Sequence, residues 1–205
     1  MELNAKKIHL MECAEKLFAE KGYAETSIRD IAKQASMNSA MISYYFGSKE
    51  KLVKTILDYR TTDLAKAFTP AVNEHENCLQ RMLEFLNYYI DKVFEQKYFY
   101  KLVFQLQSSD IESNFLEYFN VMRRKNHESL NAIFQQGASK GEGVKDLDVA
   151  MITSTLIGTL THIVFNQSYY REVNDLKKMP EKKFVALLKE RTKKHLSMVV
   201  GCMIQ

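Results

Sequence analysis

The segment from Thr26 to Leu52, TSIRDIAKQASMNSAMISYYFGSKEKL, constrains the fold most, because it holds the start and stop signals of two short helices. Ser27 begins the first helix, and Asp30 follows it at the spacing of a capping box. Asn38 is placed to cap the second helix, and Gly47 is placed to end it, since Gly tolerates the left-handed conformation after a helix end. Two short helices joined by a tight turn predict a helix-turn-helix, the motif that places its second helix in the major groove of DNA.

Both expected helices have one apolar side. In the first helix this side is formed by Ile28, Ile31, Ala32 and Ala35, and in the second by Met41, Ile42, Tyr45 and Phe46. The opposite side of the second helix carries Ser39, Ala40, Ser43 and Tyr44. Small residues beside one Tyr fit close approach to a DNA groove, whereas a solvated helix normally carries Lys and Glu there.

Three stretches, Phe18 to Tyr23, Thr26 to Ala32 and Tyr44 to Leu52, together resemble the TetR/AcrR family of bacterial transcription regulators. The resemblance covers roughly the first quarter of the chain. It implies an all-α fold, with an N-terminal three-helix DNA-binding domain and a larger C-terminal helical domain for ligand binding and dimerisation. We place the first domain at residues 1–50, including the start of a linking helix, and the second at residues 51–205.

Two positions depart from the pattern of the family. Ser36 stands where a turn Gly is common, which indicates a slightly different turn geometry. Ser43 stands where a Tyr on the base-reading face is common.

The resemblance also implies DNA contacts. Positions that generally hold phosphates in the family are occupied here by Thr26, Ser27, Arg29, Tyr44, Tyr45 and Lys49. Ser39, Ala40 and Ser43 are expected at base edges, with weak discrimination between bases. For Tyr45 the alternative is a position in the apolar core. Lys49 stands at the start of a helix, where free backbone amides favour a phosphate, and its alternative is an ordinary solvated lysine. Residues 1–60 carry ten Lys and Arg against eight Asp and Glu, so placement and not net charge supports DNA binding.

Helical spacing of apolar residues continues through the chain. We expect helices at 6–21, from about 52 to the break at Thr69 and Pro70, through the apolar region 73–107, at 112–136, at 149–170 and at 181–204, and a glycine-rich loop at 137–143. Segment 149–170 is uncharged and long enough to span a bilayer, but its many polar side chains favour a buried protein interface over a membrane. In the family the last two helices form a four-helix bundle with their copies. This implies a homodimer interface at Ser154, Gly158, Phe165, Leu188, Leu196 and Val199.

Aromatic residues with a few polar neighbours favour a pocket for a small, largely apolar effector. The set is Phe85, Tyr88, Tyr89, Phe104, Tyr118, Phe119, His127, His162 and Asn166. The alternative is that most of these side chains form ordinary core.

No residue set in the sequence indicates catalysis, a cofactor or a metal site. Cys13, Cys78 and Cys202 lack ligand or disulfide spacing and are expected to be buried, while His9 and Cys13 lack a third ligand. Without a secretory segment, we expect a bacterial cytoplasmic protein associated with the nucleoid. The hypothesis is a ligand-responsive regulator, more often a repressor in the family, whose homodimer binds a near-palindromic operator with half-sites ~34 Å apart. The alternative is an all-helical adaptor without DNA recognition.

Overall fold

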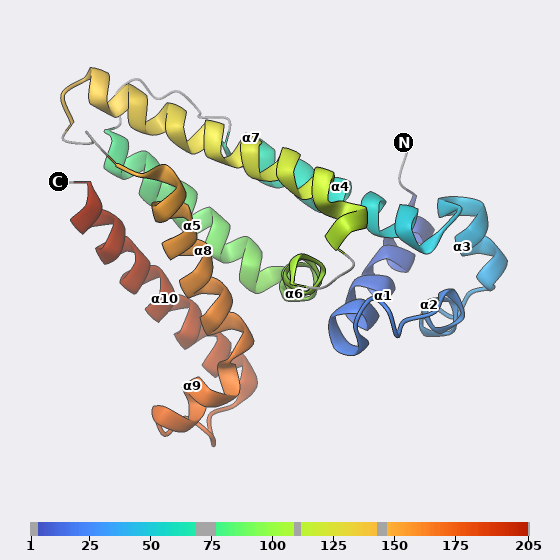
Figure 1. The fold of residues 1–205 in the computed structure, drawn as a ribbon. Helices are drawn as coiled ribbons and strands as arrows, with labels where there is room; N and C mark the ends of the chain where they lie inside the picture. The colour runs from blue at the N-terminus through green and yellow to red at the C-terminus, as the bar shows by residue number, and fades with distance from the viewer. Residues whose placement is uncertain (1–3, 69–76, 109–111, 143–146, 205) are drawn as a thin grey trace. The chain divides into compact units, whose positions relative to one another are not determined.

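The computed structural model describes residues 4–68, 77–108, 112–142 and 147–204, and every regular element in these ranges is a helix (Figure 1). This confirms the all-α prediction. The elements are α1 (Ala5–Lys21), α2 (Ile28–Gln34), α3 (Ser39–Phe46), α4 (Lys49–Phe68), α5 (Cys78–Glu95), α6 (Lys97–Gln107), α7 (Glu112–Ser139), α8 (Val149–Phe165), α9 (Gln167–Val173) and α10 (Glu181–Met203).

The chain divides into two compact units. The first unit comprises Met1–Leu64 and Gln96–Phe119, and the second comprises Ala65–Glu95 and Asn120–Gln205. Helices α1, α2, α3 and α6 belong to the first unit, α5 and α8 to α10 belong to the second, and α4 and α7 contribute residues to both. The predicted functional boundary near residue 50 stays a prediction.

The first unit is built around α1, which packs against α2 and α6. Asn4 caps α1 by accepting a hydrogen bond from the Lys7 amide at 3.0 Å, and Gly22 ends it at a φ of 93°. Glu15 of α1 is buried and accepts two hydrogen bonds from Arg60 of α4, at 2.7 and 2.9 Å. The apolar core contains Leu10, Ala14, Phe18, Ile31, Ile42, Phe46, Leu52 and Ile56.

In the second unit α10 packs against α5 over much of its length. Leu188 and Leu196 of α10 are fully buried within the single chain. They were expected at a dimer interface, and that expectation is wrong because both side chains already lie in the core of this unit. Asp91 of α5 also joins the two helices, with ion pairs of 2.7 Å to Lys189 and to Lys193.

Two helix boundaries differ from the sequence prediction. Helix α7 continues through Gly137, which is buried, and ends only at Ser139, so the glycine-rich loop was placed too early. The segment expected as one helix at 149–170 breaks at Asn166 into α8 and α9. No single helix in the described ranges is long and apolar enough to cross a membrane; α8 and α9 qualify only as a pair, bent by 78°.

The cysteines differ in exposure. Cys78 is buried as expected, and burial raises the pKa of its thiol to about 11. Cys13 is partly exposed and Cys202 is exposed, so the prediction of three buried thiols is wrong for these two. His9 Nε2 lies 3.8 Å from Cys13 Sγ, and no group of three or more potential metal ligands occurs among the described residues.

Candidate nucleic-acid interface

The first helix of the motif, α2, begins at the predicted capping box. Ser27 Oγ accepts a hydrogen bond from the Asp30 amide at 3.1 Å, and Asp30 Oδ2 accepts one from the Ser27 amide at 2.9 Å. The Ser27 hydroxyl also donates to Asp30 Oδ2 at 2.6 Å, and these bonds lower the pKa of the Asp30 carboxyl. The capping prediction is confirmed, because both orphan amides at the helix start are satisfied.

The second helix of the motif, α3, begins at Asn38, whose Oδ1 accepts from the Ala40 amide at 2.9 Å. Gly47 ends the helix at a φ of 78°. In the turn between α2 and α3, Ser36 has a φ of 54°. Ser36 therefore adopts the left-handed conformation that Gly favours, at a cost of about 1 kcal/mol, and does not escape it through a different turn geometry.

One face of α3 is open to solvent and the other is buried. Ile42 and Phe46 are buried, whereas Ala40, Ser43 and Tyr44 are exposed. Tyr44 is 83% exposed, and Ser39, the third expected base-reading residue, is half-buried. An exposed face of short side chains lets a helix backbone come close to base edges.

The residues expected at phosphates differ in their exposure to solvent. Ser27 and Arg29 are exposed like Tyr44. Tyr45 is half-buried, and Lys7 Nζ lies 5.6 Å from the centre of its ring, a neighbour that sequence reasoning missed. Thr26 is fully buried and donates its hydroxyl to the Gly22 carbonyl at 2.8 Å, so its side chain faces the interior of the unit.

Lys49 also turns inward, toward the turn that connects α1 with α2. Its Nζ donates to the carbonyls of Tyr23 at 2.7 Å, Ala24 at 3.4 Å and Thr26 at 3.0 Å. The same nitrogen lies 4.3 Å from the centre of the Tyr23 ring. Lys49 is therefore not simply a solvated lysine, and its contact with a phosphate stays a prediction.

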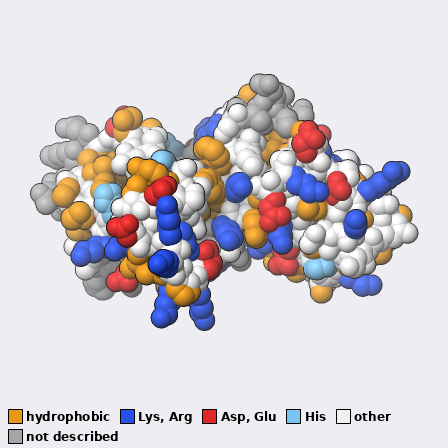
Figure 2. Space-filling model, turned by 90° about the horizontal axis from the view of Figure 1, so that it is seen from below, with side chains coloured by type: hydrophobic (Ala, Val, Ile, Leu, Met, Phe, Trp, Pro, Cys, Tyr) orange, Lys and Arg blue, Asp and Glu red, His pale blue; other side chains and the backbone are white. Residues whose placement is uncertain are grey.

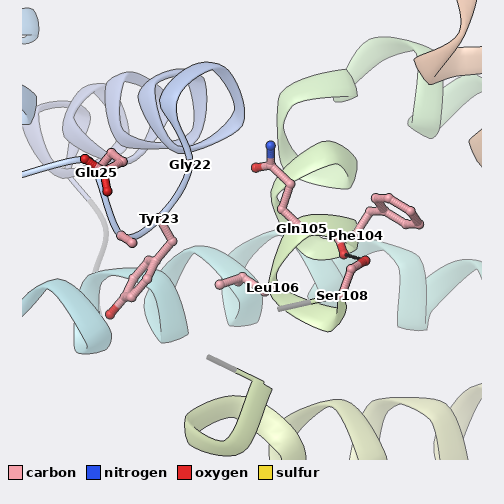
Figure 3. Close-up of a pocket in the computed structure, with 8 residues that line it drawn as sticks. Gly22, Tyr23, Glu25, Phe104, Gln105, Leu106 and Ser108 are labelled. Carbon is pink, nitrogen blue, oxygen red and sulfur yellow. Dashed lines mark hydrogen bonds between the residues drawn. The ribbon is translucent and has the colours of Figure 1, made fainter. Parts of the chain in front are cut away.

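A cleft of about 350 Å³ lies in the first unit, between the turn after α1 and the end of α6. Gly22, Tyr23 and Glu25 line it on one side, and Phe104 with Leu106 on the other (Figure 3). The two other predicted pocket residues of this unit, Tyr118 and Phe119, are not among those that line this cleft. Phe119 is buried, and Tyr118 places its hydroxyl 3.4 Å from Thr61 Oγ1. Burial raises the pKa of Tyr118 to about 12.

The remaining predicted pocket residues belong to the second unit. Phe85 and Tyr89 stack on α5 with ring centres 6.0 Å apart, and Tyr88 is half-buried on the same helix. His162 and Asn166 are exposed and lie within hydrogen-bond distance of each other, at 3.4 Å, while His127 is exposed on α7. The structure thus brings Phe85 to Tyr89, Tyr118 to Phe119 and His162 to Asn166, and a common pocket for the set stays a prediction.

Hydrophobic side chains are exposed on α8, α9 and α10, where Figure 2 shows them among Lys and Arg. The large ones are Met151, Ile157, Tyr169, Val173 and Met198. Ser154 and Gly158 are exposed on α8, and Phe165 and Val199 are half-buried. These four predicted interface residues remain accessible to a partner, unlike Leu188 and Leu196.

Comparison with known proteins identifies the N-terminal motif. Residues 10–56 match the model of the tetR family of bacterial regulatory proteins. The transcriptional repressor Rv3405c of Mycobacterium tuberculosis is 42% identical over 57 residues, 28% of this chain and 30% of that relative. The match therefore spans less than a third of that repressor's length. The repressor KstR2 of M. tuberculosis is 27% identical over 155 residues, 74% of this chain and 76% of that relative.

Solved structures with the same fold cover nearly the whole chain. The ketosteroid transcriptional regulator KstR2 of M. tuberculosis has a TM-score of 0.72 at 22% identity, covering 100% of this chain and 97% of its own. FadR of Bacillus subtilis, in complex with stearoyl-CoA, has a TM-score of 0.70 at 19% identity, covering 97% of this chain and 99% of its own.

Proposed function

This chain belongs to the TetR family of bacterial regulatory proteins, and from that premise we propose that it is a ligand-responsive, DNA-binding transcriptional repressor. The observation that carries the proposal is the exposed face of α3. Ala40, Ser43 and Tyr44 lie open to solvent on a helix whose other face, with Ile42 and Phe46, is anchored in the core. A rigid helix with an accessible face of short side chains is what major-groove recognition requires.

DNA binding is tested by fluorescence anisotropy against duplexes tiled across the DNA that flanks the gene. We expect tight, salt-sensitive binding to one near-palindromic tile. Tyr44→Ala should abolish it, whereas Tyr169→Ala, which removes another exposed tyrosine from the second unit, should not. Failure of the wild-type chain to bind every tile and a random-sequence pool would refute the proposal and favour the adaptor.

The proposed repressor acts as a homodimer through the exposed faces of α8 and α10. No neighbouring atom would lie within 4 Å of a Cβ added at Gly158, so this position of α8 is open to close approach by another helix. Exposed Met151, Ile157 and Met198 offer apolar contact area beside it. Sedimentation equilibrium should show a dimer that Gly158→Arg dissociates, and a wild-type monomer at all concentrations would contradict this part.

The proposed effector is small and largely apolar. Its support is the aromatic pair Phe85 and Tyr89, together with two structural relatives. KstR2 is described as a ketosteroid transcriptional regulator, and FadR was solved in complex with stearoyl-CoA. An effector releases DNA only if it binds the DNA-free state more tightly than the DNA-bound state. Stearoyl-CoA and a steroid should therefore be titrated into the protein–duplex complex, with free coenzyme A as the polar control. If neither lowers the anisotropy, the effector is of another class.

A further inference from the structure

The side chain of Arg81, near the start of α5, is buried in the second unit without a negatively charged partner. The residue is only 6% exposed, and its Nη1 donates a hydrogen bond to Oε1 of Gln136 on α7. Neither Nε nor Nη2 donates to any residue that the structure describes. A buried cation normally has a partner for each of its donors, because it has given up its hydration. Two of the three guanidinium nitrogens of Arg81 lack such a partner.

These two nitrogens are the pair that binds a carboxylate elsewhere in the same chain. Nε and Nη2 of Arg60 donate to the two carboxylate oxygens of Glu15, at 2.7 and 2.9 Å. The two N–H groups on this edge of a guanidinium are parallel and match two oxygens of a carboxylate or a phosphate. The Nε and Nη2 edge of Arg81 is called the Arg81 fork below. It has the donors that Arg60 uses, while Gln136 occupies Nη1 alone.

The nearby carboxylate of Glu142 does not occupy the Arg81 fork. The charges of both residues act on the thiol of Cys78, the first residue of α5. Glu142 Oε2 accepts a hydrogen bond from the Cys78 amide at 2.5 Å. Asn77 and Gln80 each accept from the amide of the other, at 3.4 and 2.9 Å. The start of α5 is therefore stabilised by its own neighbours and does not require the Arg81 fork.

Aromatic rings follow Arg81 along the same row of α5. Arg81, Phe85 and Tyr89 are four residues apart in turn, so their side chains leave one side of the helix. The rings of Phe85 and Tyr89 are nearly parallel, at 18°, and both residues are half-buried. The row spans about 12 Å along the helix axis. A cation followed by aromatic side chains suits a ligand with an anionic head and an apolar body.

We propose that the Arg81 fork binds the carboxylate or phosphate of an amphiphilic anion, whose apolar body lies along Phe85 and Tyr89. The inference rests on the proposed function, because it names the chemical class of the effector. A bound anion would remove the cost of keeping a cation without a counter-charge inside the protein. A neutral molecule of the same shape would leave the fork without acceptors, so the site should select its ligand by charge.

The first test measures ligand binding in the absence of DNA. The wild-type chain is titrated by calorimetry with decanoate, with decyl phosphate and with the neutral decanol, each below the concentration at which it forms micelles. At least one anion should bind about tenfold more tightly than decanol, which is the effect expected of a charge-assisted hydrogen-bonded pair. The tighter anion identifies the head group as a carboxylate or a phosphate. Equal affinity for decanol, or no binding of either anion, would overturn the proposal.

Three variants assign this binding to Arg81. Arg81→Met should weaken binding of the preferred anion about tenfold or more and leave that of decanol unchanged. Arg81→Lys keeps the charge but loses the fork, so its affinity should lie between those of Arg81→Met and the wild type. Arg191→Gln removes an arginine from an exposed position of α10 and should bind like the wild type. An Arg81→Met variant with the affinity of the wild type would contradict the assignment.

Urea unfolding of the ligand-free protein separates this role from a structural one. Arg81→Met should not lower the urea midpoint, because the substitution removes a buried cation and leaves no carboxylate without its partner. Arg60→Met is the comparison, since it leaves Glu15 without its partner and should lower the midpoint. An equal fall in both variants would show that Arg81 is compensated within the chain, and the proposal would be wrong.

The last test adds the preferred anion to the protein–duplex complex. The anion should weaken duplex binding by the wild-type chain and should leave that by Arg81→Met unchanged. Calorimetric binding without any effect on the duplex would refute the effector role of the site. Absence of duplex binding by the wild-type chain would instead refute the DNA-binding function, and calorimetry would then decide on the Arg81 fork alone.

Discussion

The buried ion pair between Glu15 and Arg60 allows a quantitative prediction about how α1 is held on α4. The side chains of Glu15 and Arg60 are 6% and 17% exposed, and two hydrogen bonds of 2.7 and 2.9 Å join them. Arg60→Met removes the cation and leaves the carboxylate buried without a partner. Breaking a buried pair in this way lowers the free energy of unfolding by about 3 to 5 kcal/mol. We expect a loss of about 3 kcal/mol, because Arg60 has some access to water.

The matched variant is Glu15→Leu combined with Arg60→Met, which removes both charges. We expect it to lose less than about 1 kcal/mol, since replacing a buried pair by apolar groups of similar volume is often nearly neutral. Urea unfolding followed by far-ultraviolet circular dichroism, at one fixed protein concentration, measures both values. Equal losses in the single and the double variant would refute the reasoning, because they would show that lost packing and not the unpaired charge sets the cost.

The pH dependence gives a second check on the same pair. Burial raises the pKa of Glu15 although Arg60 lowers it in part, so Arg60→Met should raise it further above the unfolded value of about 4.3. As pH falls from 7, the folded variant then takes up a proton before the unfolded chain does, and its stability deficit shrinks. A deficit of the same size at pH 7 and near pH 4.5 would exclude the buried charge as its cause.

Three further predictions concern stability. Ser27→Ala should cost about 1 kcal/mol in urea unfolding, because it removes the side-chain cap of α2. Burial would raise the pKa of Asp91, but hydrogen bonds from two lysines of α10 outweigh it, and the pKa is lowered. These ion pairs therefore stabilise the folded protein at pH values above the pKa that Asp91 has in the unfolded chain. The stabilisation is lost as the pH falls through the pKa of Asp91 in the folded protein. Asp91→Asn should therefore cost up to about 1 kcal/mol at pH 7, since the side chains are partly screened, and nothing at the acid end of a pH series. Leu188→Ala should cost about 3 kcal/mol, as expected for a fully buried leucine, whereas Met198→Ala at an exposed position of α10 should change stability by less than about 0.5 kcal/mol.

The helix-turn-helix was predictable because its signals are local. The Ser27 and Asp30 capping box and the Asn38 cap each satisfy amides within three residues along the chain, and Gly47 needs only its own φ. Such signals do not depend on what packs against the helix. The positive φ of Ser36 was not predicted, because a serine, unlike a glycine, does not itself indicate a left-handed conformation.

The assignment of faces on the later helices was less predictable because helical spacing does not identify the partner. On α10, which packs against α5 and α8, Leu188 and Leu196 are buried, while Met198 on the same helix is exposed. The sequence shows an apolar helix in both cases, and only tertiary packing separates a side facing the core from a side free for a second chain. The break at Asn166 was missed likewise, since the uncharged run continues across it.

The inward positions of Thr26 and Lys49 limit how the proposed interface can bind DNA. Thr26 and Lys49 make hydrogen bonds within the first unit, and their contacts with phosphates stay predictions. Among the other four residues expected at phosphates, Arg29 carries the only charge. Each lysine or arginine that neutralises a phosphate contributes about 0.9 to the salt slope of affinity. An interface that contacts phosphates mostly through hydroxyl groups and through the amides at helix ends should therefore have a DNA affinity that depends only weakly on salt. Its affinity should depend on how Ala40, Ser43 and Tyr44 fit in the groove. A steep slope, equivalent to many phosphate contacts for each half-site, would require cations from outside the motif, and Lys7 beside Tyr45 would be the first to replace.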